Sequence, residues 1–516
     1  MLSVIYYSLF PNPFSTPMLR YILALLALLP AFALANDNGE AADASASQRP
    51  NIIYIMSDDH ASEAISAYSH LAPHLKGVVS TPNIDTLANE GVRFDNVYCN
   101  FSLCSPSRAS IITGQYSHRT GVRRLFAAIS PDCEWVSDAL QKAGYSTALI
   151  GKWHLQNTPQ GFDHYEIVHD QGVYFNPKFR SETDVKQYQG YATDVYTDRA
   201  LEWLKTQEKT GKPYCLMLHF KAPHYPFDYA PRYEHMFDGV TIPEPDNIFE
   251  DRSISPLLKT PTPTIVSLYY PLHKHQFKTS PTDSYEQKTR DAYQFMMKNY
   301  LRCVRGIDDN VGRILKYLDE TGQANNTIVI YCADQGYWLG QHGLYDKRII
   351  LDESIRMPFL VRWPGHIKPG SVCKYLVSNT DFAPTLLDIA QSKTAKEDMP
   401  NMQGVSILPL LEGKEPTQWR SRLFYCYTAQ PPHWGLRTDR YTLACFPGTD
   451  EVELYDNLTD PKQNVNVAKD PKYAEVIKQL KAELEEEMKA IDIAPDQLPG
   501  GAREYMDNSG GTVAPL

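Results

Sequence analysis

Residues 51–60 read Asn-Ile-Ile-Tyr-Ile-Met-Ser-Asp-Asp-His, an apolar run that ends abruptly in two acids and a histidine. The run lacks strict polar alternation, which predicts a β-strand covered on both faces. Four more runs share this character: residues 146–150, 214–220, 327–332 and 359–361. Helical patterns lie between them, at residues 135–143, 191–206 and 300–318. This alternation predicts an α/β fold with an open, largely parallel sheet flanked by helices.

The pattern changes after Pro409. Short strand-like pieces at residues 423–427, 434–437, 441–446 and 453–455 precede a charged amphipathic helix at residues 473–491. They predict a small C-terminal antiparallel sheet with one helix. We therefore expect a large domain over residues 48–408, a small subdomain over 409–495 and a tail over 496–516. Residues 240–285, rich in Pro, Ser and Thr, read as a long surface excursion.

The composition describes a globular chain and argues against one class of partner. Of 516 residues, 43% are hydrophobic and 22% are charged, and the net charge is -11. An acidic total disfavours a broad basic face for nucleic acid, so we expect no nucleic-acid partner. An anionic substrate would have to be bound by a local cluster of cations.

The N-terminus has the pattern of a secretory signal peptide. Arg20 precedes an apolar run without charge from Tyr21 to Leu34, and Ala33-Leu34-Ala35 supplies an A-x-A cleavage pattern. The run is too short for a comfortable membrane span, and no Cys follows to carry a lipid, so we expect no stable membrane anchor. We interpret residues 1–35 as the signal peptide, with Met18 as the true start, and predict export to the periplasm or secretion.

Polar residues follow four of the predicted strands. They are Asp58-Asp59-His60, Lys152-Trp153-His154, Lys221 with His224, and Asp334-Gln335. Ligands of open α/β sheets bind beyond the carboxyl ends of the strands, so these groups are expected to meet at one edge. Taken singly, adjacent aspartates after a strand are more often a cap or turn; together, the four sets favour a site.

The residue types at this edge indicate a metal and an anion. Asp58, Asp59, Asp334 and the amide of Gln335 form an all-oxygen set, which suits calcium better than zinc. The cations expected nearby are Arg108, Lys152 and Lys347, with His154 and His224. A carboxylate-held metal ringed by such cations suits a tetrahedral oxyanion ester.

The nucleophile is expected at Cys104. Pro106 suits the first turn of a helix and Gly114 its end, which places residue 104 at the helix N-terminus, where an anion is favoured. Nine cysteines occur without a C-x-x-C pair. From the residues alone, Cys104 is either a low-pKa thiolate nucleophile or a structural cysteine.

The run Cys104-Ser-Pro-Ser-Arg-Ala-Ser-Ile-Ile-Thr-Gly114 resembles the C-x-P-S-R-x-x-x-[IL]-T-G signature of the type I, formylglycine-dependent sulfatases. Other segments resemble further motifs of that family in the same order: Ser57–His60, Gly151–His154, Ala222–Pro226, Ala333–Gly336 and Gly340–Lys347. The resemblance spans roughly residues 50–490, so residues 48–408 would be the sulfatase catalytic domain. Gln335 is a departure, because many members carry Asn or His there.

The resemblance implies an alkaline-phosphatase-like fold, with a large mixed, mainly parallel sheet. It implies that a maturation enzyme converts Cys104 to formylglycine, whose hydrated diol attacks sulfur. Asp58, Asp59, Asp334 and Gln335 would hold one calcium ion together with residue 104.

The same resemblance implies the remaining roles. Arg108 and Lys152 would stabilise the ionised diol. His224 and Lys347 would hold the sulfate and help to protonate the leaving oxygen. His154 would accept a proton from the second hydroxyl as sulfate is expelled.

The substrate is predicted less directly. Residues 161–165 and 171–177 resemble segments of bacterial carbohydrate sulfatases, which favours the 6-O-sulfate of N-acetylglucosamine in glycosaminoglycan or mucin-type glycans. Another sulfated sugar position and an aryl sulfate remain alternatives. A phosphate ester hydrolase of the same superfamily and an inactive glycan-binding homologue are the rival classes.

Overall fold

The computed structural model describes residues 49–259, 263–269 and 282–500. The predicted signal peptide and residues 501–516 of the predicted tail lie outside these described residues. A ten-stranded mixed sheet, ordered β13-β2-β12-β9-β1-β8-β4-β5-β6-β7, forms the framework. Its strands are β1 (Asn51–Asp58), β2 (Val92–Phe94), β4 (Ser146–Lys152), β5 (His164–Val168), β6 (Lys178–Arg180), β7 (Val185–Gln187), β8 (Tyr214–Pro223), β9 (Thr327–Ala333), β12 (Phe359–Arg362) and β13 (Ser371–Cys373).

The centre of the sheet is parallel, as predicted. β9, β1, β8, β4 and β5 all run in the same direction, and Ile52 of β1 lies opposite Cys215 on one side and Ile328 on the other. Every residue of β1 is buried, because Tyr54 and Met56 pack into one apolar core and Ile53 and Ile55 into another. An apolar run without alternation is what a strand covered on both faces requires.

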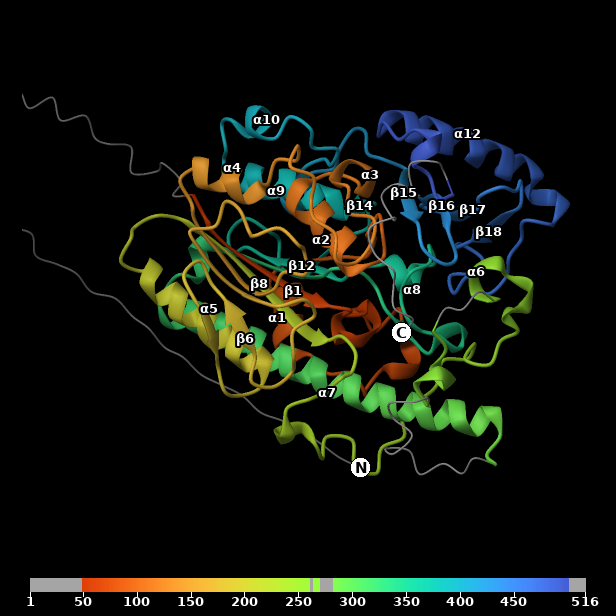
Figure 1. Ribbon diagram of the computed structural model, residues 1–516, viewed down its shortest axis with the longest axis horizontal. Coiled ribbons are helices and arrows are strands. Elements are labelled where there is room, and N and C mark those ends of the chain that lie inside the picture. Colours follow the sequence, from red (N-terminus) through yellow and green to blue (C-terminus); the bar gives the residue numbers. More distant parts are fainter. Residues whose placement is uncertain (1–48, 260–262, 270–281, 501–516) are drawn as a thin grey trace, which may run out of the picture. The chain divides into compact units, whose positions relative to one another are not determined.

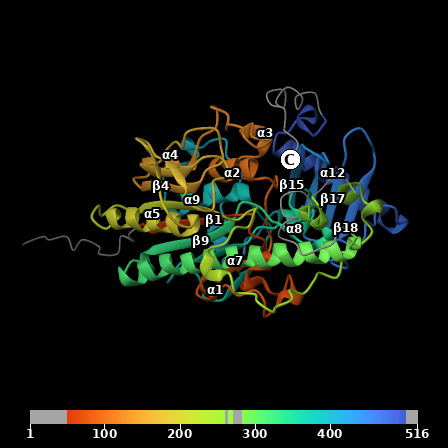
Figure 2. The ribbon, with the colours of Figure 1, turned by 60° about the horizontal axis from the view of Figure 1, so that its bottom comes forward.

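Helices cover both faces of the sheet (Figure 1). α2 (Cys104–Thr113), α4 (Val136–Lys142) and α9 (Phe382–Ile389) lie on one face, and α1 (Pro82–Asn89), α5 (Ala192–Gln207) and α7 (Tyr285–Glu320) lie on the other. Figure 2 shows the same layering from another direction. The fold is therefore a layered α/β fold with the sheet in the middle.

The C-terminal part forms a second, smaller sheet. β15 (Arg422–Tyr427), β16 (His433–Thr438), β17 (Tyr441–Cys445) and β18 (Val452–Asp456) pair antiparallel in sequence order. α12 (Ala474–Ala490) packs on this sheet through Leu480 and Leu484. The opposite side contacts the large sheet's loops: the Tyr425 hydroxyl donates to the Arg348 carbonyl at 2.6 Å, and Ile350 N–H donates to His433 Nε2 at 3.1 Å.

Shorter elements complete the described chain. They are β3 (Val97–Tyr98), β10 (Trp338–Leu339), β11 (Tyr345–Asp346), β14 (Val377–Ser378), α3 (Ser117–Thr120), α6 (Pro256–Lys259), α8 (Asp352–Ile355), α10 (Ala395–Asp398) and α11 (Leu408–Leu411). Among the described residues, no helix combines the length and apolar character needed to cross a membrane.

Two features differ from the sequence-based expectation. α7 begins at Tyr285, well before residue 300, and Met296 and Met297 of the added part are buried. The excursion predicted over residues 240–285 is not only a surface segment, because Ile242 and Leu257 are fully buried in its described part. Scattered apolar residues between prolines do not reveal burial in advance, since they show no helix or strand period.

Candidate active site

All ten residues predicted for the site meet at the carboxyl edge of the central strands. Asp58 ends β1, Asp334 and Gln335 follow β9, and Lys152 ends β4. The other members come from different elements: Asp59, Cys104, Arg108, His154, His224 and Lys347. Parallel strands bring their carboxyl ends to one edge, which is why residues almost 300 positions apart in the chain become neighbours.

The three aspartates form the acidic centre of the site. Oxygen atoms of Asp58, Asp59 and Asp334 lie within 4.8 Å of one another, and all three side chains are buried. Burial raises the pKa of Asp59 to about 7, with Asp58 and Asp334 adding to the rise against the opposing effect of Lys347. Like charges this close require a cation to keep them ionised together.

The turn that carries Asp59 is held in an unusual conformation. Asp59 has a φ of 63°, a backbone conformation that residues other than glycine rarely adopt. Its N–H donates to Asp334 Oδ1 at 3.2 Å, and the Tyr300 hydroxyl of α7 donates to its carbonyl at 2.5 Å. Strain of this kind is common where a backbone presents a ligand.

The residues present fit a hard divalent cation such as calcium. Gln335 Nε2 donates to Asp59, while Gln335 Oε1 is buried without a hydrogen-bond partner among the described residues. A buried amide oxygen without a donor is costly unless something else ligates it. Three carboxylates and one free amide oxygen make the all-oxygen set that calcium prefers.

Three cations are paired with the three aspartates. Lys347 Nζ lies 2.6 and 2.7 Å from the two carboxylate oxygens of Asp59, and Lys152 Nζ donates to Asp58. Arg108 Nε and one terminal nitrogen each lie 3.0 Å from Asp334 Oδ2. Another Arg108 nitrogen donates to the Lys152 carbonyl at 2.7 Å, which fixes the guanidinium between α2 and β4.

Cys104 is the first residue of α2 and lies against the acidic centre. Its thiol donates to Asp58 Oδ1 at 3.3 Å, and the side chain is almost fully buried. Burial and the neighbouring Asp58 raise the pKa of this thiol. This environment favours the protonated thiol over a thiolate, because burial and Asp58 outweigh the opposing charges of Lys152 and Lys347.

The two histidines have different surroundings. Both ring nitrogens of His154 are buried without a partner among the described residues, and burial lowers its pKa. His224 Nδ1 donates to the Tyr225 carbonyl at 2.7 Å, which leaves Nε2 to face Asp59 Oδ2 at 3.6 Å. A neutral imidazole with a free nitrogen can accept or deliver a proton.

Sequence reasoning missed Phe126. Its ring stands edge-on to His154 with centroids 5.4 Å apart, yet half of the side chain is exposed. Phe126 also has a φ of 58°. No motif or period marks this residue, so only the folded chain identifies it as a neighbour of the site.

A second group lies on the side of Lys152. The amide oxygen of Gln171 accepts from Lys152 Nζ, and the Tyr174 hydroxyl donates to the His224 carbonyl. Lys221 Nζ lies 5.1 Å from the centre of the Tyr174 ring. The sequence predicts Lys221 at this edge of the sheet. No sequence feature shows whether this lysine is a functional or a structural residue.

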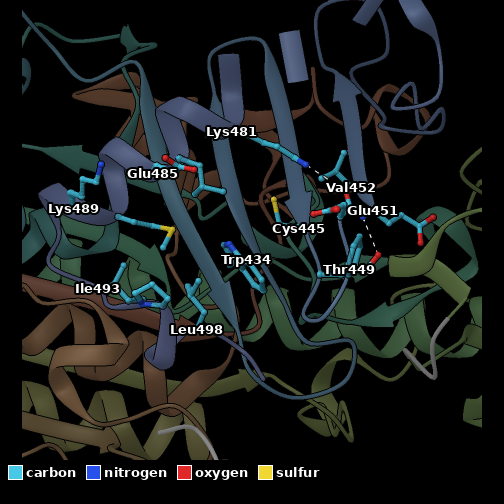
Figure 3. Close-up of a pocket in the computed structure, with 15 residues that line it drawn as sticks. Trp434, Cys445, Thr449, Glu451, Val452, Lys481, Glu485, Lys489, Ile493 and Leu498 are labelled. Atoms are coloured by element: carbon cyan, nitrogen blue, oxygen red, sulfur yellow. Dashed lines mark hydrogen bonds between the residues drawn. The ribbon is translucent and has the colours of Figure 1, made fainter. Parts of the chain in front are cut away.

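A described cavity lies away from the acidic centre. A pocket of about 490 Å³ separates the C-terminal sheet from α12 and is lined by Trp434, Lys481 and Glu485, among others (Figure 3). None of the ten site residues lines it. Trp434 therefore faces this pocket and not the acidic centre.

Family comparisons match nearly the whole described chain. The model of the family described as "Sulfatase" matches residues 50–392, and that described as "N-sulphoglucosamine sulphohydrolase, C-terminal" matches residues 340–490. N-acetylglucosamine-6-O-sulfatase of Bacteroides thetaiotaomicron is 36% identical over 93% of this chain and 94% of its own length. Human N-acetylglucosamine-6-sulfatase is 28% identical over 76% of this chain and 69% of its own length.

A solved structure matches as well. An enzyme in complex with its substrate D-glucosamine-2-N,6-O-disulfate is 36% identical to this chain and superposes with a TM-score of 0.78. The match covers 86% of this chain and 98% of that chain. The overall fold of this chain is therefore shared with that enzyme.

Proposed function

We propose that this chain removes the 6-O-sulfate of N-acetylglucosamine in glycosaminoglycan or mucin-type glycans. The premise is that the chain belongs to the sulfatase family and is a sulfuric ester hydrolase. The carrying observation is the likeness at 36% identity over almost the full length of an N-acetylglucosamine-6-O-sulfatase. The solved relative whose printed substrate is a 6-O-sulfated glucosamine supports the same sugar position.

Cys104 is the proposed precursor of the nucleophile. A formylglycine-generating maturation enzyme would convert it, and the hydrated aldehyde would supply one hydroxyl to attack sulfur and a second to expel the sulfate. The position suits this role because residue 104 begins α2 and lies beside Asp58. Ser105 Oγ donates to the His154 carbonyl at 2.7 Å, which keeps His154 next to residue 104.

Asp58, Asp59, Asp334 and Gln335 would hold one calcium ion. Bound there, the ion would withdraw negative charge from the sulfate ester. The chain's own contribution is to bury the four ligands and to fix Asp334 with Arg108. Oxygen atoms that are already within reach of one another bind a cation with little rearrangement.

The cations and histidines would handle the sulfate and the protons. Lys152 and Arg108 flank residue 104 and would favour its anionic form, while Lys347 and His224 would hold the sulfate oxygens. His224 Nδ1–H is held by the Tyr225 carbonyl, so Nε2 would first take up a proton, and the resulting imidazolium would deliver it to the leaving oxygen. His154 is held neutral by burial and has a free nitrogen, so it would take the proton from residue 104.

The site would act after export. The N-terminal pattern predicts cleavage after residue 35, followed by folding in the periplasm or outside the cell. We also keep the proposed division into a catalytic domain over residues 48–408 and a C-terminal subdomain over 409–495.

The decisive test of the substrate is a panel of defined sulfated monosaccharides and disaccharides. We expect the highest kcat/KM on N-acetylglucosamine-6-sulfate, and a lower value on other sulfate positions, aryl sulfates and phosphate esters. A preference for phosphate esters by the converted enzyme would overturn the sulfatase assignment. Retained glycan binding without turnover would instead favour an inactive homologue.

The nucleophile is tested by the intact mass of the peptide that carries residue 104. Native material should show the formylglycine mass, and Cys104→Ala should lose turnover completely while remaining folded. Cys215→Ala is the matched control, because Cys215 is equally buried and lies near the start of β8, whereas the site lies at the other end of the strands. Finding only unmodified Cys104 in active protein would contradict the mechanism.

A further inference from the structure

Lys221 is a buried cation without an ion-pair partner. It lies near the end of β8, three residues before His224, and only 4% of it is exposed. Among the described residues, no carboxylate forms an ion pair with its Nζ and no acceptor hydrogen-bonds to it. Lys152, Lys347 and Arg108 of the same edge are each paired with an aspartate. Lys221 is thus different in kind from the three site cations.

The ammonium of Lys221 lies over the face of Tyr174, 5.1 Å from the ring centre. A cation–π contact offsets only a small part of the cost of burying a charge without an ion-pair partner. Burial, followed by the charge of Lys152, lowers the pKa of Lys221 to about 8. No carboxylate of the described residues therefore lies within ion-pair distance of this ammonium.

Lys221 lies within electrostatic range of the reaction centre. The charges of Lys152, Asp58, Asp59 and Cys104 all act on it. Tyr174 links it to the sulfate-binding side, because the same side chain also donates to the His224 carbonyl. An anion that enters the site beside His224 is the partner available to this lysine.

We propose that Lys221 binds a sulfo group of the substrate and is a specificity-determining residue for the reaction. The sulfo group is either the ester that is cleaved or a second one on the same sugar; both offer the same oxygen chemistry. This inference rests on the proposed function, since it takes a sulfated sugar as the ligand.

The test compares Lys221→Met with Lys212→Met, an exposed lysine just before the same strand. We expect Lys221→Met to lower kcat/KM at least tenfold, with an unchanged or higher Tm, because a buried charge is removed. Lys212→Met should leave both values unchanged. Lys221→Arg keeps the charge and should recover part of the activity, and it serves as the second variant if Lys221→Met fails to fold.

Two further readouts identify the sulfo group. If Lys221 contacts the ester that is cleaved, the affinity for inorganic sulfate falls about tenfold by calorimetry, and turnover of mono- and disulfated glucosamine falls equally. If it contacts a second sulfo group, sulfate affinity is unchanged and only the disulfated sugar is affected. If Lys221→Met and Lys212→Met give equal values of kcat/KM and of sulfate affinity with every substrate, the proposal is overturned.

These readouts separate the failure of this inference from the failure of the proposed function. If wild-type protein turns over no 6-sulfated sugar, the proposed substrate is wrong. The two variants can then still be compared by their affinity for inorganic sulfate, measured by calorimetry, and by kcat/KM on the ester that the wild type cleaves best. A difference there supports Lys221 as a sulfo-group contact, and no difference overturns it.

Discussion

Gln335 lies beside the three aspartates of the acidic centre, and only one of its two polar side-chain atoms has a hydrogen-bond partner among the described residues. Its nitrogen donates to Asp59, but its buried oxygen has no donor among the described residues. We expect Gln335→Leu to weaken calcium binding by at least about tenfold, because an oxygen ligand is lost. Calorimetry on metal-depleted protein measures this, and Gln335→Asn should bind more tightly than Gln335→Leu. Equal affinity of wild type and Gln335→Leu would show that the amide is not a ligand.

Phe126 is an exposed aromatic residue whose contact is a predicted catalytic histidine. Its ring stands edge-on to that of His154, and half of the side chain remains open to a ligand. We expect Phe126→Ala to raise KM for the sugar substrate about fivefold, since one aromatic contact stabilises by about 1 kcal/mol. Phe249→Ala is the control, because Phe249 is also partly exposed but its ring lies against Arg290. Similar kinetics of the two variants would rule out a role for Phe126.

The residues that sequence reasoning found and missed differ in one physical respect. Asp58, Lys152 and Asp334 are polar groups at the ends of buried strands, and that position alone indicates a site. Phe126 is an apolar residue in a loop, where the sequence shows neither period nor polarity. The proposed role of Lys221 rests on the lack of an ion-pair partner among the described residues. Which charges pair is decided by the folded chain and is not visible in the sequence.

At the scale of elements, α2 depends on the glycine that ends it. Gly114 has a φ of 67°, and a Cβ there would lie 3.1 Å from Met402 and 3.3 Å from Ala383. We expect Gly114→Ala to destabilise by about 2 kcal/mol, through backbone strain of about 1 kcal/mol and crowding of similar size. Chemical unfolding measures the change.

Gly413→Ala is the matched control for this helix end. Gly413 has a φ of 71° but nothing within 4 Å of the added Cβ, so it should show the backbone cost alone. Equal destabilisation by the two variants would mean that the packing around the end of α2 yields freely. A larger effect of Gly114→Ala would show that the helix carrying Cys104 and Arg108 is fixed by this close packing.

The predicted central elements agree with the structure within a few residues, whereas the edges of the sheet were not predicted. β1, β8 and β9 are long apolar runs, so burial on both faces is visible in the sequence. β2 and β6 are only three residues long, and their pairing depends on neighbours far along the chain. The direction of β12, antiparallel to β9, likewise follows from the path of the connection and not from local sequence.

At the scale of the whole molecule, the C-terminal sheet contacts the segment that follows Lys347. Tyr425 and His433 bind the backbone at Arg348 and Ile350, and Gln463 accepts from the Asp352 N–H at 2.7 Å. The sequence indicated a separate small sheet but not this contact with the catalytic segment. The position of Lys347 therefore depends on residues more than 70 positions later in the chain.

The ion pair between Arg437 and Asp352 joins the two parts, and its removal tests this dependence. Arg437 Nε lies 2.7 Å from Asp352 Oδ1, and both side chains are buried. We expect Arg437→Met to destabilise by about 3 kcal/mol, since it leaves a buried carboxylate with only part of its compensation. Lys478→Met, which removes one partner of an exposed ion pair on α12, should change little. The measurement is unfolding by denaturant. Equal midpoints for the two variants would contradict the coupling between the C-terminal sheet and the segment that follows Lys347.

The same pair predicts a pH dependence. Burial alone would raise the pKa of Asp352, but Arg437 and Arg356 outweigh it and lower the pKa to about 2, below the ordinary value of 3.8. A carboxyl whose folded pKa is depressed stabilises fully above its ordinary pKa, and this stability is lost as the pH falls toward the folded value. The difference in unfolding free energy between wild type and Arg437→Met should therefore be constant from pH 5 to 7 and should shrink as the pH falls below about 4. A difference that persists unchanged at pH 3 would mean that Arg437 acts through packing and not through its charge.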